Sequence, residues 1–225
     1  NISFNIKKGE TLAILGSTGS GKSTLVNLIP RFYDVTEGSI KIGGKDIREI
    51  DRKSLQNSVG IVMQNTVLFS GSIADNMRMG KEDATEEEMI DALKKADIAD
   101  FVLSLPDGLN HKIEQDATNI SGGQRQRISI ARTLISEPDI LILDDSLSAV
   151  DLITESKIRK ALNKLKMTKI IIAQRISSIK DANKILMIED GKMLCYGSHD
   201  ELYKTSAEYK EVYDSQVQNA EEGKL

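Results

Sequence analysis

The 225-residue sequence predicts an α/β fold, in which helices cover a parallel sheet and a helical segment is inserted. Apolar, strand-like runs alternate with amphipathic, helix-like stretches along most of the chain, as strand-helix-strand crossovers require. The strand signals stop from Ser72 to about Ile135, where helix signals replace them. They resume at 139–143, 168–173 and 184–189. The sequence therefore predicts one sheet whose strands come from both ends of the chain.

The elements before the insert begin with ISFNI (2–6), whose alternating apolar residues predict a strand. TLAIL (11–15) predicts a buried strand that runs into a glycine-rich loop, and a helix is expected to start near Lys22. The other elements expected here are strands at 39–42 and 59–63 with a polar helix at 51–58 between them.

Local capping and turn signals define the later elements. Thr85 and Glu88 form a capping-box pattern that opens a helix, and a second helix is expected to end near 106–108. An amphipathic helix is expected at 152–165. At the end of the chain we expect a hairpin turn at 190–191 into 192–196, a helix cap at 198–201 and a frayed polar end at 219–225.

Composition limits the class of protein. With 40% hydrophobic residues and a net charge of -4, the sequence predicts a globular domain without broad nucleic-acid binding, although QRQR (124–127) leaves a local basic stripe open. No apolar run approaches the roughly 18 residues of a membrane helix. The single cysteine, Cys195, excludes an internal disulfide framework and fits a reducing compartment. We therefore expect a cytosolic domain, with any phosphate binding confined to a local site.

The strongest chemical motif is GSTGSGKS (16–23), which lies between a predicted strand and a predicted helix. Glycines in such a loop let successive backbone N–H groups face inward around phosphates, and the helix N-terminus adds positive potential. Lys22 would reach the β- and γ-phosphates, and the Ser23 hydroxyl would bind Mg²⁺. A flexible Gly/Ser turn is the alternative, but the motif in this setting predicts nucleotide binding.

ISGGQ (120–124) is a second glycine-rich helix start, without a lysine. Its serine hydroxyl and glycine N–H groups could hold a phosphate. Taken alone, the pattern favours an N-cap serine followed by permissive glycines. The run ILILDDSL (140–147) ends a buried strand on Asp144 and Asp145, which predicts a metal site with a base beside it.

Taken together, five motifs in this order and spacing resemble the nucleotide-binding domain of an ABC (ATP-binding cassette) transporter. The motifs are GSTGSGKST, Gln64 in VMQNTVLFSGSIADNM, ISGGQRQR, ILILDDSLSAVD and IIIAQRISSI. The segment after Gln64 is similar to the exporter branch. The resemblance implies a P-loop NTPase (RecA-like) core with a parallel sheet, antiparallel N-terminal strands and an inserted α-helical subdomain.

The resemblance also implies roles for individual residues. Gln64 would contact Mg²⁺ and water, Asp144 would be the metal-side carboxylate, and Ser146–Asp151 would contact a second cassette, unless that run only caps the next helix. The metal set is thus Ser23, Gln64 and Asp144. The implied nucleotide contacts are Gly16, Ser17, Thr18, Gly19, Ser20, Gly21, Lys22, Ser23 and Thr24, with Ser121, Gly122, Gly123 and Gln124 acting on ATP held by a second cassette.

The sequence departs from the family pattern at the catalytic positions. Asp145 stands where the family has the glutamate that polarises water, and its carboxylate is retracted by about 1.5 Å. Gln174 replaces a histidine, so it cannot carry a positive charge. Before the signature, Glu114-Gln115 replaces a glycine-glutamate pair, and Ile120 replaces a leucine. The family's adenine-stacking aromatic would precede residue 1. Asp145 and Gln174, together with a signature whose phosphate-binding atoms are intact, resemble the degenerate half of a heterodimeric exporter.

We therefore expect the ATP-binding cassette of a heterodimeric ABC exporter, an ATPase that uses Mg²⁺ and hydrolyses ATP slowly through Gln64, Asp145 and Gln174. The expected partners are a second half-transporter subunit and an N-terminal transmembrane domain, at the cytoplasmic face of the membrane, with no nucleic acid. The alternatives are a non-hydrolysing regulatory module and a soluble, non-transport cassette ATPase. The expected division is a core at 1–71, a helical subdomain at 72–133, a second core part at 134–205 and a C-terminal helix and tail at 206–225.

Overall fold

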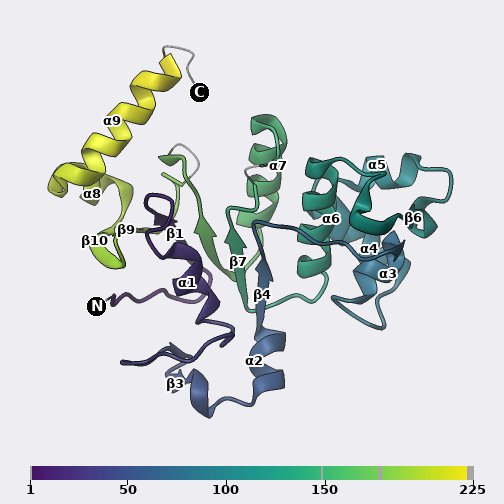
Figure 1. Ribbon diagram of the computed structural model, residues 1–225, viewed down its shortest axis with the longest axis horizontal. Helices are drawn as coiled ribbons and strands as arrows, with labels where there is room; N and C mark the ends of the chain where they lie inside the picture. The colour runs from purple at the N-terminus through teal and green to yellow at the C-terminus, as the bar shows by residue number, and fades with distance from the viewer. Residues whose placement is uncertain (1, 148, 177–178, 222–225) are drawn as a thin grey trace. The chain divides into compact units, whose positions relative to one another are not determined.

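A computed structural model describes residues 2–147, 149–176 and 179–221, and the chain divides into two compact units (Figure 1). Unit one comprises Asn1–Leu55 and Met167–Leu225, and unit two comprises Gln56–Lys166. The finer division predicted from the sequence stays a prediction.

Unit one is built on a sheet of mainly parallel strands. Strand β1 (Thr11–Leu15) pairs in parallel with β8 (Thr168–Ile172) on one side and with β9 (Lys184–Glu189) on the other. Strand β10 (Lys192–Gly197) adds to β9 in the antiparallel sense, through the predicted hairpin. Because β1 is central and buried, its sequence is a continuous apolar run rather than an alternating one.

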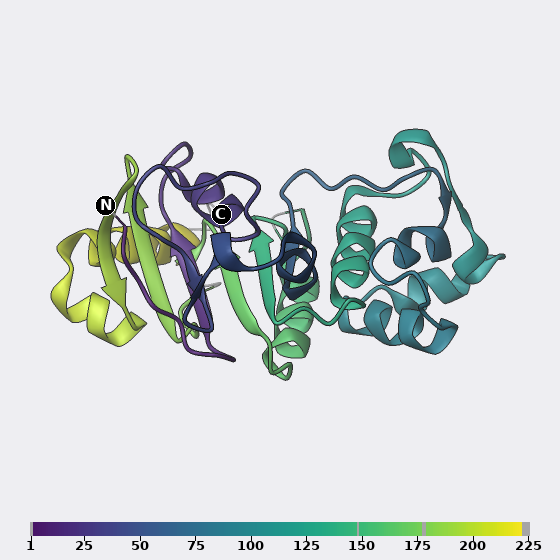
Figure 2. The same ribbon diagram turned by 90° about the horizontal axis from the view of Figure 1, so that it is seen from below.

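The helices of unit one include α1 (Lys22–Asn27) and, at the end of the chain, α8 (His199–Thr205) and α9 (Ala207–Glu221). Helix α8 packs on β10, and α9 packs on α8, as Figures 1 and 2 show. The predicted cap of α8 is confirmed as a capping box between Ser198 and Glu201. Helix α2 (Arg52–Ser58) spans the boundary between the two sequence ranges.

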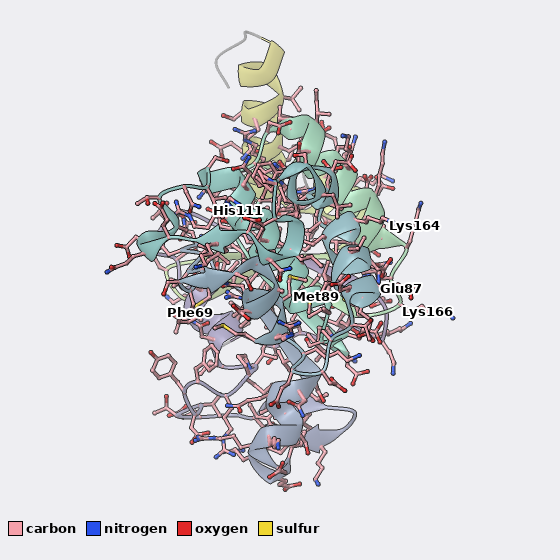
Figure 3. The ribbon with its side chains drawn as sticks, turned by 90° about the vertical axis from the view of Figure 1, so that its right-hand side faces the viewer. Phe69, Glu87, Met89, His111, Lys164 and Lys166 are labelled. Carbon is pink, nitrogen blue, oxygen red and sulfur yellow. The ribbon has the colours of Figure 1, made fainter. Side chains whose placement is uncertain are left out.

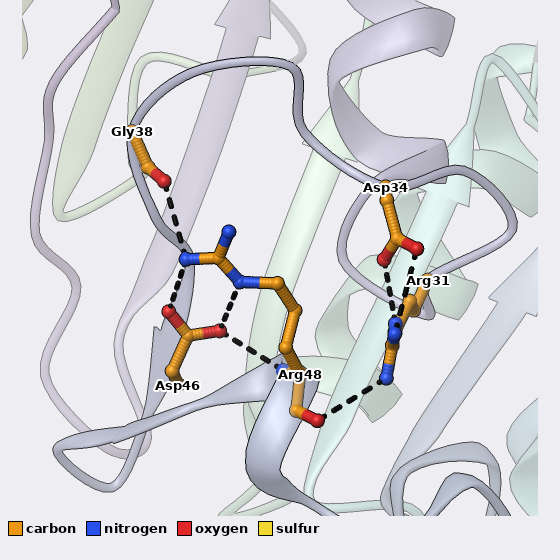
Figure 4. Close-up of polar contacts among 5 residues, drawn as sticks. All are labelled: Arg31, Asp34, Gly38, Asp46 and Arg48. Atoms are coloured by element: carbon orange, nitrogen blue, oxygen red, sulfur yellow. Dashed lines mark hydrogen bonds and ion pairs between the residues drawn. The ribbon is translucent and has the colours of Figure 1, made fainter.

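Charged pairs hold the segment between α1 and α2. Strands β2 (Lys41–Ile42) and β3 (Lys45–Asp46) pair antiparallel and lead into a 3₁₀ turn at Ile47–Glu49. The Arg48 guanidinium donates two hydrogen bonds to the Asp46 carboxylate, at 3.0 and 2.8 Å (Figure 4). These bonds lower the pKa of Asp46 to about 2. Arg31, paired with Asp34, also donates to the Arg48 carbonyl, at 3.4 Å.

Unit two combines a parallel strand pair with a group of helices. Strand β4 (Val59–Val62) pairs with β7 (Ile140–Asp144), so that both run in the same direction. The helical part can be followed in Figure 2. Its elements are α3 (Ile73–Arg78), α4 (Glu86–Lys95), α5 (Ala99–Ser104), α6 (Gly122–Leu134), α7 (Leu152–Asn163), the short strands β5 (Gly71–Ser72) and β6 (Lys112–Ile113), and 3₁₀ turns at Gly108–Asn110 and Gln115–Ala117.

Helix α4 shows how the pattern of the insert becomes structure. The predicted capping box between Thr85 and Glu88 is confirmed, with the Thr85 amide donating to the Glu88 carboxylate at 2.9 Å. Met89 and Leu93, four residues apart, are buried on one face, whereas Glu87 is exposed on another (Figure 3).

Four expectations about individual elements were wrong. Residues 2–6 do not form a strand. Their burial alternates as predicted, but no neighbouring strand pairs with their backbone among the described residues. It contacts Tyr196 instead, whose hydroxyl donates to the Asn5 carbonyl. The strand expected at 39–42 is only Lys41–Ile42, and the insert contains the short strands β5 and β6. Helix α9 continues to Glu221, into the end predicted as frayed, while 222–225 lie outside the described residues.

Within the part of the chain that the structure describes, no helix is long and apolar enough to cross a membrane.

Candidate nucleotide-binding site

The glycine-rich loop joins β1 to α1 in unit one, as predicted, and two of its glycines have geometric reasons. A Cβ atom on Gly16 would lie 2.1 Å from the Ile188 carbonyl oxygen, so no other residue fits without a backbone shift. Gly21 precedes α1 with φ of 97°, in the left-handed region that favours glycine. The turn after β9 supports the loop, because the Gly191 amide donates to the Ser20 carbonyl at 3.1 Å.

Lys22 lies with its ammonium group inside this loop. Its Nζ donates to the carbonyl oxygens of Gly16 and Ser17, at 2.9 and 2.6 Å, and to the Ser20 hydroxyl at 3.4 Å. Ser20 is buried beneath the loop. The residues on the outer side of the loop are exposed, namely Ser17, Thr18, Gly19, Ser23 and Thr24. The loop therefore presents a cation and exposed backbone in one place, an arrangement suited to an anion.

Gln174 belongs to the same edge of unit one. It follows β8 by two residues, and β8 is the parallel neighbour of β1, so the segment that carries Gln174 and the loop leave the sheet on the same side. The Gln174 side chain is exposed, and its backbone carbonyl accepts a hydrogen bond from the Gln216 side chain at 2.9 Å. No pattern in the sequence indicates this contact of Gln216. Ser177 and Ser178 of the same motif lie outside the described residues.

Unit two brings together three of the predicted catalytic and metal residues. The register of β4 and β7 pairs Val62 with Leu143, so Gln64 and Asp144 follow at the same edge. Asp144 is only 7% exposed, at the last position of β7. The Gln64 Nε2 donates to the Asp145 carboxylate at 3.3 Å. The amide and the carboxylate that the sequence singles out, 81 residues apart, are therefore direct neighbours.

The backbone at Asp145 takes an uncommon conformation. Its φ is 46°, in the left-handed region, which aspartate tolerates better than most residues but which still costs free energy. The next residue, Ser146, is buried, and its hydroxyl has no hydrogen-bond partner among the described residues. Strained backbone and a buried orphan hydroxyl cluster at functional sites, and nothing in the sequence signals either feature.

The run Ser146–Asp151 includes a helix cap. The Asp151 carboxylate accepts from the amides of Ile153 and Thr154, at 3.1 and 3.0 Å, and so caps α7. Ser148, in the middle of the run, lies outside the described residues. The N-cap alternative raised by the sequence is therefore confirmed for Asp151, while the contact of this run with a second cassette stays a prediction.

The second glycine-rich start is a closed capping box. The Ser121 amide donates to Gln124 Oε1 at 2.9 Å, and the Gln124 amide donates to the Ser121 hydroxyl oxygen at 3.2 Å. Ile120 is buried just before it. The alternative raised by the sequence, in which Ser121 is an N-cap serine followed by glycines, is thus confirmed. Capping uses a lone pair of the hydroxyl, which leaves its O–H as a donor for an external group.

Four side chains anchor α6 through contacts that the sequence did not predict. The Arg127 guanidinium donates to the carbonyls of Asp97 and Gly123, at 2.6 and 3.3 Å. The Thr66 hydroxyl donates to the buried Gln126 amide oxygen at 2.9 Å, two residues after Gln64. Arg132 donates to the Val67 carbonyl at 2.9 Å. The segment that carries Gln64 is therefore tied to the helix that Ser121 begins.

The unusual pair before the signature is held by local contacts. The Glu114 carboxylate accepts from the Thr118 hydroxyl at 2.9 Å, and the Glu114 amide donates to Asn119 Oδ1 at 3.1 Å. Asp116 and Ala117 then have φ of 59° and 51°. The pair thus belongs to a tight turn that leads into Ile120.

The predicted magnesium ligands have suitable chemistry. They offer a hydroxyl (Ser23), an amide oxygen (Gln64) and a carboxylate (Asp144), the hard oxygens that Mg²⁺ prefers. No cluster of three or more His, Cys, Asp or Glu side chains occurs among the described residues.

Comparison with known proteins identifies the family. The model of the ABC transporter family, described as "ABC transporter", matches residues 1–148. This chain belongs to the ABC transporter family. It is 45% identical over 221 residues to the putative multidrug export ATP-binding/permease protein YgaD of Bacillus subtilis (strain 168), covering 97% of this chain and 38% of the relative. It is 48% identical over 216 residues to the uncharacterized ABC transporter ATP-binding protein YfiB of the same organism, covering 96% of this chain and 38% of YfiB.

A solved ABC exporter has the same fold. The structure of a bacterial Atm1-family ABC exporter with ATP bound superposes with a TM-score of 0.92 at 39% identity, covering 96% of this chain and 38% of that one. The chain is therefore an ABC ATP-binding domain with a P-loop NTPase fold, as the sequence predicts. It spans about two fifths of the length of the relatives that it matches.

Proposed function

We propose that this ABC cassette powers export. It binds Mg-ATP on its glycine-rich loop, hydrolyses that ATP slowly, and lends Ser121–Gln124 to the faster site of a second cassette. One observation carries the proposal. In this member of the ABC family, the glycine-rich loop surrounds the Lys22 ammonium group, which donates hydrogen bonds to two carbonyl oxygens of the loop. Those carbonyls keep the cation positioned before a nucleotide arrives.

The nucleotide contacts come from the loop and the start of α1. Lys22 exchanges its carbonyl contacts for phosphate oxygens, and the backbone amides of the exposed outer loop supply further donors. Ser23, Gln64 and Asp144 would hold a magnesium ion, which would neutralise phosphate charge. Ser20, buried beneath the loop, keeps the backbone in shape rather than touching solvent.

Slow hydrolysis follows from Asp145 and Gln174. The aspartate is one methylene shorter than the family's glutamate, and a misplacement of about 1 Å costs on the order of a hundredfold in rate. The hydrogen bond from Gln64 further engages this carboxylate. Gln174 donates a hydrogen bond to the γ-phosphate but cannot carry the positive charge of a histidine. Binding is preserved because Lys22 and Asp144 are unchanged.

The signature supports a division of labour between two subunits. The capping box fixes Ser121 at the start of α6 while leaving its O–H to donate, and Gly122 leaves the helix start open. We infer a heterodimer in which this helix start closes over ATP on the sister cassette. The name of the YgaD relative, an ATP-binding/permease protein, and its greater length support a transmembrane domain on the same polypeptide, with the cassette at the cytoplasmic face.

A regulatory cassette is the second candidate function. Asp145 and Gln174 together also fit a regulatory cassette that binds ATP and never turns it over, on its own or with a partner. ATP turnover in the reconstituted two-subunit transporter distinguishes these functions. A soluble, non-transport cassette ATPase is disfavoured because the similar proteins are named as an export permease and an exporter.

Calorimetry of ATP binding tests the proposal. Lys22→Ala is expected to weaken Mg-ATP binding by about a hundredfold, because hydrogen bonds to charged groups contribute about 1.5–3 kcal/mol each. Lys53→Ala, an exposed lysine on α2, is the matched control and is expected to bind ATP normally. Unchanged binding by a folded Lys22→Ala variant contradicts the assignment of the loop.

A further inference from the structure

The segment that follows β8 continues past the end of its neighbour β1. The last ladder bond runs from the Ala173 amide to the Ile14 carbonyl, at 3.3 Å. Beyond Leu15, β1 ends and the chain turns into the phosphate loop. Ile176, three residues after that bond, is fully buried, where an unpaired amide is costly.

The Gln216 side chain bonds to the backbone on both sides of Arg175. Its Nε2 donates to the Gln174 carbonyl at 2.9 Å, and its Oε1 accepts from the Ile176 amide at 2.7 Å. In a parallel sheet, one residue bonds in this way to a carbonyl and an amide two positions apart on the neighbouring strand. The side-chain amide thus takes the place of a strand beside Arg175.

Helix α9 gives Gln216 a firm base. Tyr209 is fully buried, and its hydroxyl lies 2.8 Å from His199 Nδ1. The Tyr213 ring packs 5.0 Å from the His199 ring and 5.3 Å from the Tyr203 ring. Positions 209, 213 and 216 fall on one face of a helix, so the face that anchors α9 also directs Gln216.

We propose that Gln216 is a positioning residue of the nucleotide site. It fixes the backbone of 174–176 and thereby holds the Gln174 side chain against the γ-phosphate, so that the C-terminal helix controls a contact specific to ATP. The proposal rests on the proposed function, because it takes Gln174 as the γ-phosphate contact. It adds that this contact depends on a residue 42 positions away in the sequence.

Amide hydrogen exchange of the nucleotide-free, 225-residue chain tests the clamp itself. Gln216→Met keeps the side-chain length and removes both hydrogen bonds, so the Ile176 amide is expected to exchange about tenfold faster. Gln216→Glu keeps an acceptor for that amide and is expected to retain most of its protection. Gln218→Met, an exposed position on the same helix, is the matched control. Equal exchange in the Gln216→Met variant and the unmodified chain overturns the clamp.

Nucleotide binding tests the positioning role, since ADP has no γ-phosphate. We expect Gln216→Met and Gln174→Ala each to weaken Mg-ATP binding about threefold to tenfold while ADP binding stays within twofold, as loss of one hydrogen bond predicts. The double variant is expected to bind ATP no more weakly than Gln174→Ala, because Gln216 acts through residue 174.

The outcomes separate the two proposals. Additive losses in the double variant, or equal losses for ATP and ADP, show that Gln216 has only a structural role and overturn the positioning proposal. If the unmodified chain binds neither nucleotide, the proposed function fails and the positioning role fails with it, whereas the exchange result still decides whether the clamp exists.

Discussion

The chain contains two glycine-rich helix starts that look alike in sequence and differ in structure. At the phosphate loop, α1 begins at the left-handed Gly21, and no side chain among the described residues caps it. At the signature, Ser121 and Gln124 close the start of α6 with a reciprocal capping box. The first start holds a lysine beside exposed backbone, while the second bonds the amides of Ser121 and Gln124 within its own capping box and keeps the serine O–H as a donor.

The two starts also differ in whether the fold itself requires a glycine. In the loop, Gly16 is required because the Ile188 carbonyl occupies the space of a side chain. In the signature, the space around Gly122 is open to 4 Å, so the fold itself does not require a glycine there. A glycine that the fold does not need points to an external group that approaches the backbone.

Replacing one glycine from each start gives the largest expected contrast. Gly16→Ala is expected to destabilise the chain by about 1–3 kcal/mol, as overpacking does, and to weaken ATP binding at least tenfold. Gly122→Ala is expected to stabilise α6 by about 0.5–1 kcal/mol and to leave ATP binding by the isolated chain unchanged. Thermal unfolding and calorimetry measure both effects. Equal losses in the two variants contradict the comparison.

Restoring the family residues at this chain's loop, where we propose slow hydrolysis, is expected to change the rate. Asp145→Glu together with Gln174→His is expected to raise hydrolysis at this chain's loop on the order of a hundredfold, because the carboxylate regains its reach. The measurement is single-turnover conversion of ATP to ADP in the two-subunit transporter, with the sister loop disabled by a lysine-to-alanine change. Each single substitution serves as a control, and an unchanged rate in the double variant shows that the two departures are not the cause of slow hydrolysis.

A third helix start, capped by Asp151, gives the smallest effect. Hydrogen bonds from the Thr154 and Ile153 amides lower the pKa of the Asp151 carboxyl below its usual value. A depressed folded-state pKa stabilises the fold above the unfolded-state pKa of about 3.9, and the stability is lost as the pH falls toward the folded value. Asp151→Asn, which also caps helices, is expected to flatten this part of the stability profile. A profile with unchanged slope in acid unfolding experiments contradicts this role.

Local chemistry explains what the sequence could predict. The capping boxes that begin at Thr85 and Ser198 and the phosphate loop depend on residues a few positions apart, so their patterns are visible in the sequence. The pairing of Gln64 with Asp145 was within reach because both follow parallel strands, and such strands end at one edge of a sheet.

Long-range contacts explain the rest. Gln216 lies in a polar stretch of α9, and nothing near it in the sequence marks its two hydrogen bonds to a distant segment. The same holds for Arg127 and the Asp97 carbonyl. The strand expected at Ile2–Ile6 was wrong for a related reason, since alternation indicates which side chains are covered and not whether a neighbouring strand is present.

ATP turnover of the reconstituted two-subunit transporter tests whether the signature of this chain serves the faster site of the sister cassette. ATP occupancy is checked in each variant. Ser121→Gly removes the hydroxyl at a cost of only a few tenths of a kcal/mol in capping, and is expected to lower turnover about 10²- to 10³-fold, as loss of one preorganised donor does. Asp145→Ala acts only at the slow site and is expected to change turnover much less. If Asp145→Ala stops turnover while Ser121→Gly leaves it intact, the division of labour between the two sites is the reverse of the one proposed.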